Sequence, residues 1–131
     1  MQRLLMIAGT ALLAMTMHAS ADGDAAKGEK VFKKCKACHA VGPDAKNKVG
    51  PELNGIVGRS WGVVEGFKYS KGLLEMADGK VWDEETLEVY LKKPKDLIPK
   101  TKMSFAGLKK DDDRANVIAY LAQFNEDGST K

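Results

Sequence analysis

Apolar side chains recur at the three- and four-residue spacing of an amphipathic helix in several stretches of this chain. In the first stretch, Gly28, Val31 and Phe32 share one face of a helix predicted over residues 25–34, and Asp24 can cap its first turn. A glycine inside a helix costs about 1 kcal/mol relative to alanine. We therefore expect a second helix to approach this one closely at Gly28.

The second half of the chain contains further helical patterns. A short turn is predicted over residues 71–76, and Asp83 can cap a helix over residues 84–93 that Pro94 ends. Acidic residues at the start of this helix and lysines at its end match the helix dipole. Its inward-facing residues are Leu87, Tyr90 and Leu91.

A last helix is predicted over residues 112–124, with Asp111 as its cap. Its apolar stripe consists of Val117, Ile118, Leu121 and Phe124. This stripe can cross the helix over residues 25–34 at Gly28. Residues 40–81 are otherwise mostly loop, and no segment has a convincing strand pattern, so the pattern indicates an all-α fold.

The N-terminal segment, residues 1–21, has the pattern of a secretory signal peptide. Arg3 precedes an apolar run over residues 4–17, and Ala19-Ser20-Ala21 supplies the small residues of a cleavage site. The alternative is a membrane anchor, but this run is shorter than the roughly 18 residues that indicate a spanning helix. We expect cleavage after Ala21, which leaves residues 22–131 as one exported domain in the periplasm.

Composition narrows the classes to which this domain can belong. The chain has 131 residues, of which 44% are hydrophobic and 30% charged, and this globular balance excludes a disordered or polytopic membrane protein. A formal net charge of +3 is too small to indicate a nucleic-acid binder. After cleavage, the domain keeps a single histidine, His39, and both cysteines.

Cys35-Lys36-Ala37-Cys38-His39 has the C-x-x-C-H spacing of a c-type haem attachment motif. Two thiols at this spacing can add to the two vinyl groups of one haem, and the adjacent imidazole can then ligate the iron. A zinc site would need a carboxylate as its fourth ligand. A disulfide would give His39 no role, and a thioredoxin-like dithiol would need a preceding strand. Haem is the favoured interpretation.

The second axial ligand has to come from another part of the chain. Imidazole and thioether sulfur are the usual ligands in small electron carriers, and the domain has no second histidine. Met76 lies in a short apolar patch at helical spacing, where a methionine most often fills the core. Met103 lies in a loop entered through Pro99, and loops commonly carry functional residues.

A series of ordered blocks extends over about residues 23–125. The blocks are Gly28-x-x-x-Phe32, Cys35-x-x-Cys38-His39, Gly50-Pro51-x-Leu53-x-Gly55-x-x-Gly58-Arg59, Gly66-Phe67-x-Tyr69-Ser70, Trp82-x-x-x-x-Leu87-x-x-Tyr90-Leu91-x-x-Pro94, Ile98-Pro99-x-Thr101-Lys102-Met103-x-Phe105-Ala106-Gly107 and Ile118-Ala119-Tyr120-Leu121. Together they resemble class I cytochrome c of the small soluble bacterial cytochrome c2 or c-550 type. The resemblance implies an all-α fold of about four to five helices and long loops wrapped around one covalently bound haem c.

The resemblance also implies roles for individual residues. Cys35 and Cys38 would form the haem thioethers, and His39 and Met103 would be the axial ligands of the iron. The carbonyl of Pro51 would accept a hydrogen bond from His39. The residues near the haem propionates would be Arg59, Tyr69, Ser70 and Trp82. The residues lining the haem pocket would be Leu53, Ile56, Tyr90, Leu91, Thr101 and Phe105.

An iron closed by His and Met has no open position for a substrate, so we expect a monomeric electron shuttle and not an enzyme. The alternative is a haem protein with a labile methionine, acting in gas binding or peroxide chemistry. The resemblance implies a quinol–cytochrome c oxidoreductase as donor, and a terminal oxidase, peroxidase, denitrifying reductase or photosynthetic reaction centre as acceptor. Lysines flanking the two ligand regions are expected to form the docking face: Lys33, Lys34, Lys36, Lys46, Lys48, Lys95, Lys100, Lys102, Lys109 and Lys110.

Overall fold

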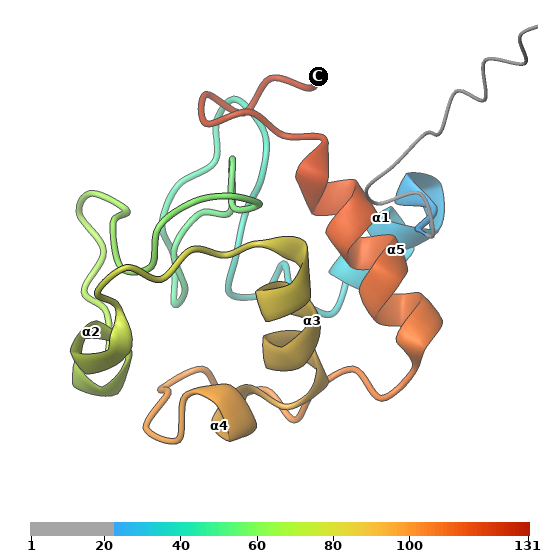
Figure 1. The fold of residues 1–131 in the computed structure, drawn as a ribbon. Coiled ribbons are helices and arrows are strands. Elements are labelled where there is room, and N and C mark those ends of the chain that lie inside the picture. Colours follow the sequence, from blue (N-terminus) through green and yellow to red (C-terminus); the bar gives the residue numbers. More distant parts are fainter. Residues whose placement is uncertain (1–22) are drawn as a thin grey trace, which may run out of the picture.

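The computed structural model describes residues 23–131, so the predicted signal peptide lies outside the described part of the chain. Its helices are α1 (Ala25–Phe32), α2 (Lys71–Met76), α3 (Glu84–Lys92), α4 (Pro94–Leu97) and α5 (Asp111–Ala122) (Figure 1). Only Lys93 separates α3 from α4, and loops join the other helices. Over these residues β pairing is limited to two isolated bridges, Ser60 with Val81 and Phe124 with Thr130. None of the helices between residues 23 and 131 is long and apolar enough to cross a membrane.

Short polar side chains begin three of the helices, as the sequence pattern favours. The Asp24 carboxylate accepts a hydrogen bond from the Lys27 amide at 3.1 Å, and the Ser70 hydroxyl caps α2 in the same way. At α3, the Asp83 carboxylate accepts from the Thr86 amide at 2.7 Å. Hydrogen bonding by Thr86 lowers the pKa of Asp83.

Two local predictions are wrong, and one helix was not predicted. Asp111 is the first residue of α5 and not its cap, because its carboxylate contacts the Arg114 guanidinium three residues later. Met76 is 36% exposed at the end of α2 and does not fill the core. Pro94 ends α3 as predicted, but it also begins α4, since its fixed φ suits the first position of a helix.

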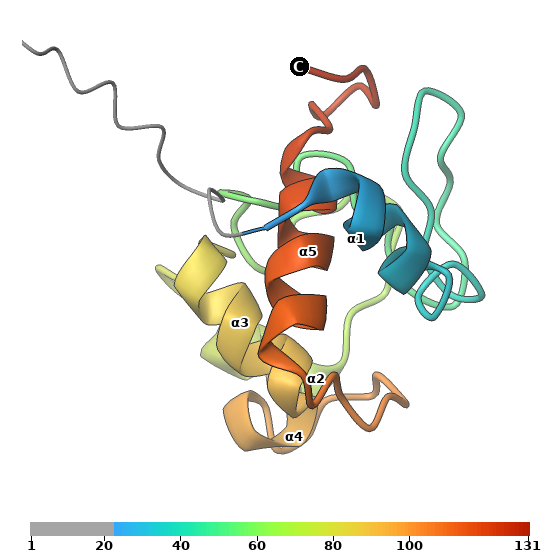
Figure 2. The same cartoon turned by 90° about the vertical axis from the view of Figure 1, so that its right-hand side faces the viewer.

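α1 and α5 cross at Gly28, as the glycine predicts (Figure 2). A Cβ atom at this position would lie 1.9 Å from the Asn116 carbonyl oxygen and 2.7 Å from the Tyr120 Cβ. The same crossing is tied by a hydrogen bond of 2.8 Å from the Asp24 amide to the Asn116 side-chain oxygen. The missing side chain of Gly28 therefore sets the distance between the two helices.

Arg114 ties α5 to the segment that precedes it and to α3. Its guanidinium is 3% exposed, donates to the Leu108 carbonyl at 2.6 Å and contacts the Glu88 carboxylate. The Leu108 amide in turn donates to the Leu91 carbonyl at 2.7 Å. The end of the Met103 loop is thereby held against the last turn of α3.

Candidate functional site

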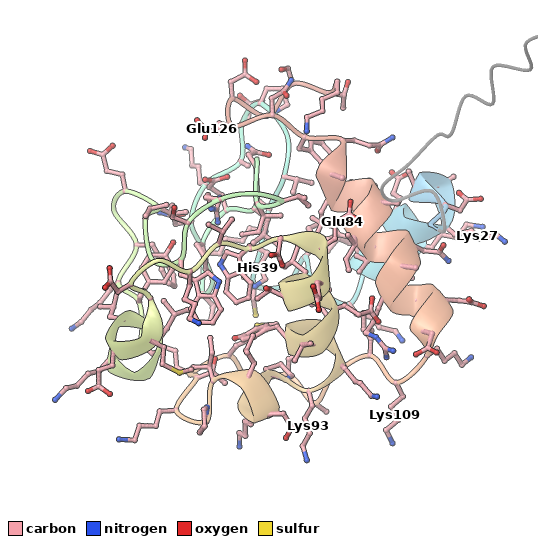
Figure 3. All side chains as sticks on the ribbon, viewed as in Figure 1. Lys27, His39, Glu84, Lys93, Lys109 and Glu126 are labelled. Atoms are coloured by element: carbon pink, nitrogen blue, oxygen red, sulfur yellow. The ribbon has the colours of Figure 1, made fainter. Side chains whose placement is uncertain are left out.

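A cavity of about 240 Å³, lined mainly by apolar side chains, lies inside the fold. Its walls come from the turns that follow α1, from α2, α3 and α5, from Trp82, and from the loops around residues 49–59, 67–70 and 101–105. Figure 3 shows His39 inside the molecule, whereas charged side chains such as Lys93, Lys109 and Glu126 project from its edges. An apolar cavity of this kind suits a large organic ligand with few polar groups.

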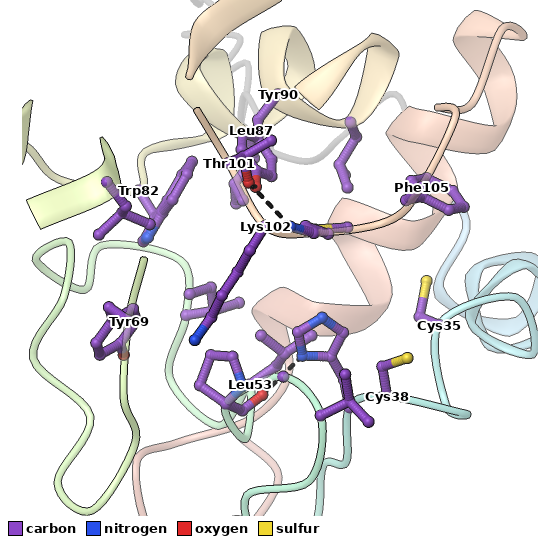
Figure 4. A pocket seen from close by; sticks show the side chains of 18 of the residues that line it. Cys35, Cys38, Leu53, Tyr69, Trp82, Leu87, Tyr90, Thr101, Lys102 and Phe105 are labelled. Atoms are coloured by element: carbon purple, nitrogen blue, oxygen red, sulfur yellow. Dashed lines mark hydrogen bonds between the residues drawn. The ribbon is translucent and has the colours of Figure 1, made fainter. Parts of the chain in front are cut away.

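Cys35, Cys38 and His39 lie on helical turns that continue from α1. The amides of Cys38 and His39 both donate to the Cys35 carbonyl, at 3.1 and 3.0 Å. Residues three and four apart on such turns face the same side. Both cysteines and the imidazole line the cavity as a result, and the two cysteines are not joined by a disulfide (Figure 4).

The His39 imidazole is 8% exposed and is oriented by its neighbours. Its Nδ1 lies 2.7 Å from the Pro51 carbonyl oxygen, so Nδ1 carries the hydrogen and Nε2 keeps a lone pair. Burial lowers the pKa of His39, which favours this neutral form. A Cβ atom at Gly50 would lie 2.2 Å from His39 Cε1, so only glycine allows the chain to pass the ring here.

The Met103 loop is anchored to α3 through hydroxyl groups. The Tyr90 and Thr101 hydroxyls lie 2.7 Å apart, and the Thr101 oxygen also accepts from the Met103 amide at 3.2 Å. Burial raises the pKa of Tyr90, which keeps its phenol protonated. Met103 lines the cavity and Met76 does not.

One part of the cavity wall is polar and holds unused hydrogen-bond donors. The Tyr69 oxygen accepts from the Val64 amide at 3.0 Å and the Ser70 oxygen accepts from the Leu73 amide at 3.2 Å. Each hydroxyl therefore still has a hydrogen to donate. Burial raises the pKa of Tyr69, so its hydrogen stays on the phenol. Figure 4 shows Tyr69 and Trp82 across the cavity from Cys35 and Cys38.

Trp82 and Arg59 complete this polar wall. Trp82 stacks on Trp61 with ring centroids 4.5 Å apart and meets the Tyr90 ring edge-on at 5.0 Å. The Arg59 side chain is 9% exposed and donates to the Asn54 carbonyl at 2.9 Å. Burial lowers the pKa of Arg59, and the nearby Glu52 carboxylate opposes this shift. The guanidinium stays charged and can face a further anion.

The structure brings every residue that was expected to bind or surround the haem to this one cavity. They are Cys35, Cys38, His39, Pro51, Arg59, Tyr69, Ser70, Trp82, Tyr90, Thr101, Met103 and Phe105, with Leu53, Ile56 and Leu91 beside them. Sequence reasoning gave no role in the cavity to Phe67 or Val49, which also line it, and it assigned Lys34 only to docking. The only signal for Phe67 was its place inside a block that carries the resemblance, and for Val49 its place next to one.

The alternative metal site has no support in the part of the chain that the structure describes. Residues 23–131 contain no group of three or more His, Cys, Asp and Glu side chains placed to hold a metal ion. By contrast, two thiols, an imidazole and a thioether surround an apolar cavity with spare donors at one side. This donor set fits a haem with an apolar macrocycle, two vinyl groups and two carboxylates.

Comparison with known proteins decides the family. The model of the cytochrome c family matches residues 25–125. This chain belongs to the cytochrome c family. It is 48% identical over 126 residues to cytochrome c2 of Blastochloris viridis, and this alignment covers 96% of this chain and 98% of the relative. It is 57% identical over 105 residues to cytochrome c-550 of Ancylobacter novellus, over 79% of this chain and 98% of the relative.

A solved structure agrees with these relatives. Cytochrome c2 from Rhodospirillum centenum superposes with a TM-score of 0.74 at 43% identity, over 79% of this chain and 99% of that one. The predicted class I cytochrome c fold is thereby confirmed. The protein carries covalently bound haem c and is a monohaem electron carrier rather than an enzyme, exchanging electrons with redox partners.

Proposed function

We propose that this protein shuttles single electrons between membrane redox complexes in the periplasm, with His39 and Met103 as the axial ligands of its haem iron. The observation that carries the ligand assignment is the hydrogen bond of 2.7 Å between His39 Nδ1 and the Pro51 carbonyl, which leaves Nε2 free to bind a metal. Met103 is the described thioether that lines the same cavity. Cys35 and Cys38 anchor the haem through thioethers.

When bound, haem supplies a one-electron ferrous–ferric couple. The neutral His39 imidazole and the Met103 sulfur would hold the iron and would leave it no site for a substrate. A thioether ligand opposite an imidazole raises the reduction potential relative to other axial sets. Apolar walls from Leu53, Leu91 and Phe105 exclude water and disfavour the extra charge of the ferric form.

Arg59, Tyr69, Ser70 and Trp82 hold the haem carboxylates in this proposal. A buried carboxylate is costly unless it is hydrogen-bonded. The uncommitted hydrogens of the Tyr69 and Ser70 hydroxyls and the charged Arg59 guanidinium supply the donors. The rest of the haem pocket includes Tyr90, Thr101 and Phe105, which also line the cavity.

The cellular setting follows from the N-terminal segment and the family. Residues 1–21 act as a cleaved signal peptide, and residues 22–131 form the exported domain. A quinol–cytochrome c oxidoreductase is the electron donor. The acceptor is a terminal oxidase, a peroxidase, a denitrifying reductase or a photosynthetic reaction centre.

Visible spectroscopy tests the closed iron. We expect purified protein to give a low-spin spectrum that carbon monoxide does not change in the reduced form, with a weak far-red sulfur-to-iron band in the oxidised form. Such a spectrum requires both axial positions to be occupied by strong ligands. A reduced spectrum that shifts with the gas would contradict Met103 ligation and favour gas binding or peroxide chemistry.

Lysines at the rim of the cavity are the proposed docking contacts. Lys34 and Lys102 both line the cavity, which places positive charge beside the route for electrons. The Lys102 ammonium is also used within the chain: it donates to the Lys68 carbonyl and lies 5.1 Å from the Phe67 ring centroid. Lys34 is therefore the better position at which to test docking alone.

Lys34→Glu is expected to slow electron transfer to the natural partner about fivefold to tenfold at low salt, because a rim charge mainly changes the association rate. The absorption spectrum should not change. Lys80→Glu is the matched control, since Lys80 is exposed and does not line the cavity. Stopped-flow rates over a salt series measure the effect, and equal rates for both variants would remove Lys34 from the docking face.

A further inference from the structure

A carboxylate is fixed immediately behind the arginine of the polar wall. Arg59 Nη1 lies 3.4 Å from Glu52 Oε1, and Arg59 Nη2 donates to the Glu52 backbone carbonyl at 3.0 Å. Arg59 lines the cavity and Glu52 does not. Of these two paired residues, Arg59 is therefore the one that borders the cavity, and Glu52 contacts it from outside the lining.

Glu52 is held in this place by contacts on several sides. Its Oε2 accepts from the Asn54 amide at 2.7 Å, and its own amide donates to the Asn47 side-chain oxygen at 2.9 Å. Asn54 is itself 5% exposed and makes two hydrogen bonds of 2.9 Å to the backbone of Gly42. The negative charge is thus part of a rigid loop and cannot move away from Arg59 without breaking these bonds.

Solvent screens this pair only weakly. The side chains of Arg59 and Glu52 are 9% and 21% exposed. Charges that are largely removed from water interact with their surroundings more strongly than surface charges do. The field that Arg59 projects into the cavity is consequently reduced by a fixed negative charge on its outer side.

We propose that Glu52 tunes the reduction potential of the haem: its carboxylate offsets the positive field of Arg59 and so makes the haem harder to reduce. The physical reason is that the ferric form has one more positive charge than the ferrous form. A fixed anion stabilises the ferric form and lowers the potential, whereas a fixed cation does the opposite. The inference rests on the proposed function, in which Arg59 faces the haem carboxylates.

Glu52→Gln is the direct test, because the amide has the same shape and keeps an oxygen that can accept from Asn54 or Arg59. The electron-exchange equilibrium of the haem-loaded protein with ferrocyanide and ferricyanide is measured at neutral pH. We expect the variant to shift toward the reduced protein about fourfold to sixteenfold, the size expected for one charge acting over roughly 10–20 Å at an effective dielectric constant of about 20.

Two further variants separate the inference from the proposed function. Arg59→Gln should shift the same equilibrium toward the oxidised protein. Glu85→Gln, which removes an exposed carboxylate in the first turn of α3, should leave it unchanged. A shift with Arg59→Gln but none with Glu52→Gln would overturn the inference alone. No shift with Arg59→Gln would overturn the proposed position of Arg59 and the inference with it.

Glu52→Ala distinguishes an electrostatic role of the Glu52 carboxylate from a purely structural role in its loop. It removes the carboxylate and its hydrogen bonds together, so we expect the same direction of shift as with glutamine and a lower thermal midpoint. If Glu52 only braced its loop, the alanine variant would lose thermal stability while the equilibrium of the glutamine variant stayed at the wild-type value. That combination would overturn the tuning role.

Discussion

Met103→Ala is expected to open the iron to exogenous ligands while leaving the haem covalently attached. The reduced variant should bind carbon monoxide at least about 100-fold more tightly than the wild type, since a ligand contact of about 3 kcal/mol no longer has to be broken and each 1.4 kcal/mol corresponds to a factor of ten. The reduction potential should fall, because a thioether ligand raises it. Gas titration followed by absorbance measures the first effect and redox titration the second.

Met76→Ala is the matched control. It removes the same side chain from a partly exposed position at the end of α2 that does not line the cavity. Its spectrum and its response to carbon monoxide should equal those of the wild type. If Met103→Ala behaved like Met76→Ala, Met103 would not be the sixth ligand.

Gly28→Val is expected to destabilise the haem-loaded protein by about 3 kcal/mol or more, or to prevent accumulation of folded protein. Overpacking usually costs about 1–3 kcal/mol, and here the first added atom would already lie 1.9 Å from a backbone oxygen of α5. Relief requires the two helices to move apart, which exposes apolar surface along their whole contact. Urea unfolding of the loaded protein measures the loss.

Ala26→Val is the control that separates the steric clash between α1 and α5 from the lower helix propensity of valine. Ala26 lies on the exposed side of α1, so valine there adds a β-branched residue to the same helix without meeting α5. The expected cost is about 0.5 kcal/mol, the propensity difference between the two residues. Equal losses in the two variants would show that the close approach at Gly28 does not limit stability.

Features that depend on neighbouring residues were predictable. The caps at Asp24 and Asp83 need only a carboxylate three residues before an amide, and both form as expected. The turns through Cys35 and His39 also follow local rules, since side chains three and four apart share a face. Such interactions involve few alternatives, so a short stretch of sequence contains the information for them.

The two errors arise where the packing of a helix decides what a side chain contacts. Asp111 has the residue type and position of a cap, but the buried Arg114 takes its carboxylate, and Arg114 is placed by its bond to the Leu108 carbonyl. Met76 has the spacing of a core residue, yet α2 is short and leaves it partly in solvent. Neither outcome can be read from a local pattern.

The sequence by itself determined every described helix except α4, the paired thiols beside one histidine and the resemblance that named the expected cavity residues. Only the tertiary structure decided how these residues meet: that Gly50 passes against the His39 ring, that hydroxyls hold the Met103 loop and that Glu52 lies behind Arg59. The physical reason is the separation along the chain of the residues that interact. Capping and helical spacing act within one turn, whereas contacts between loops depend on how the whole chain packs around the cavity.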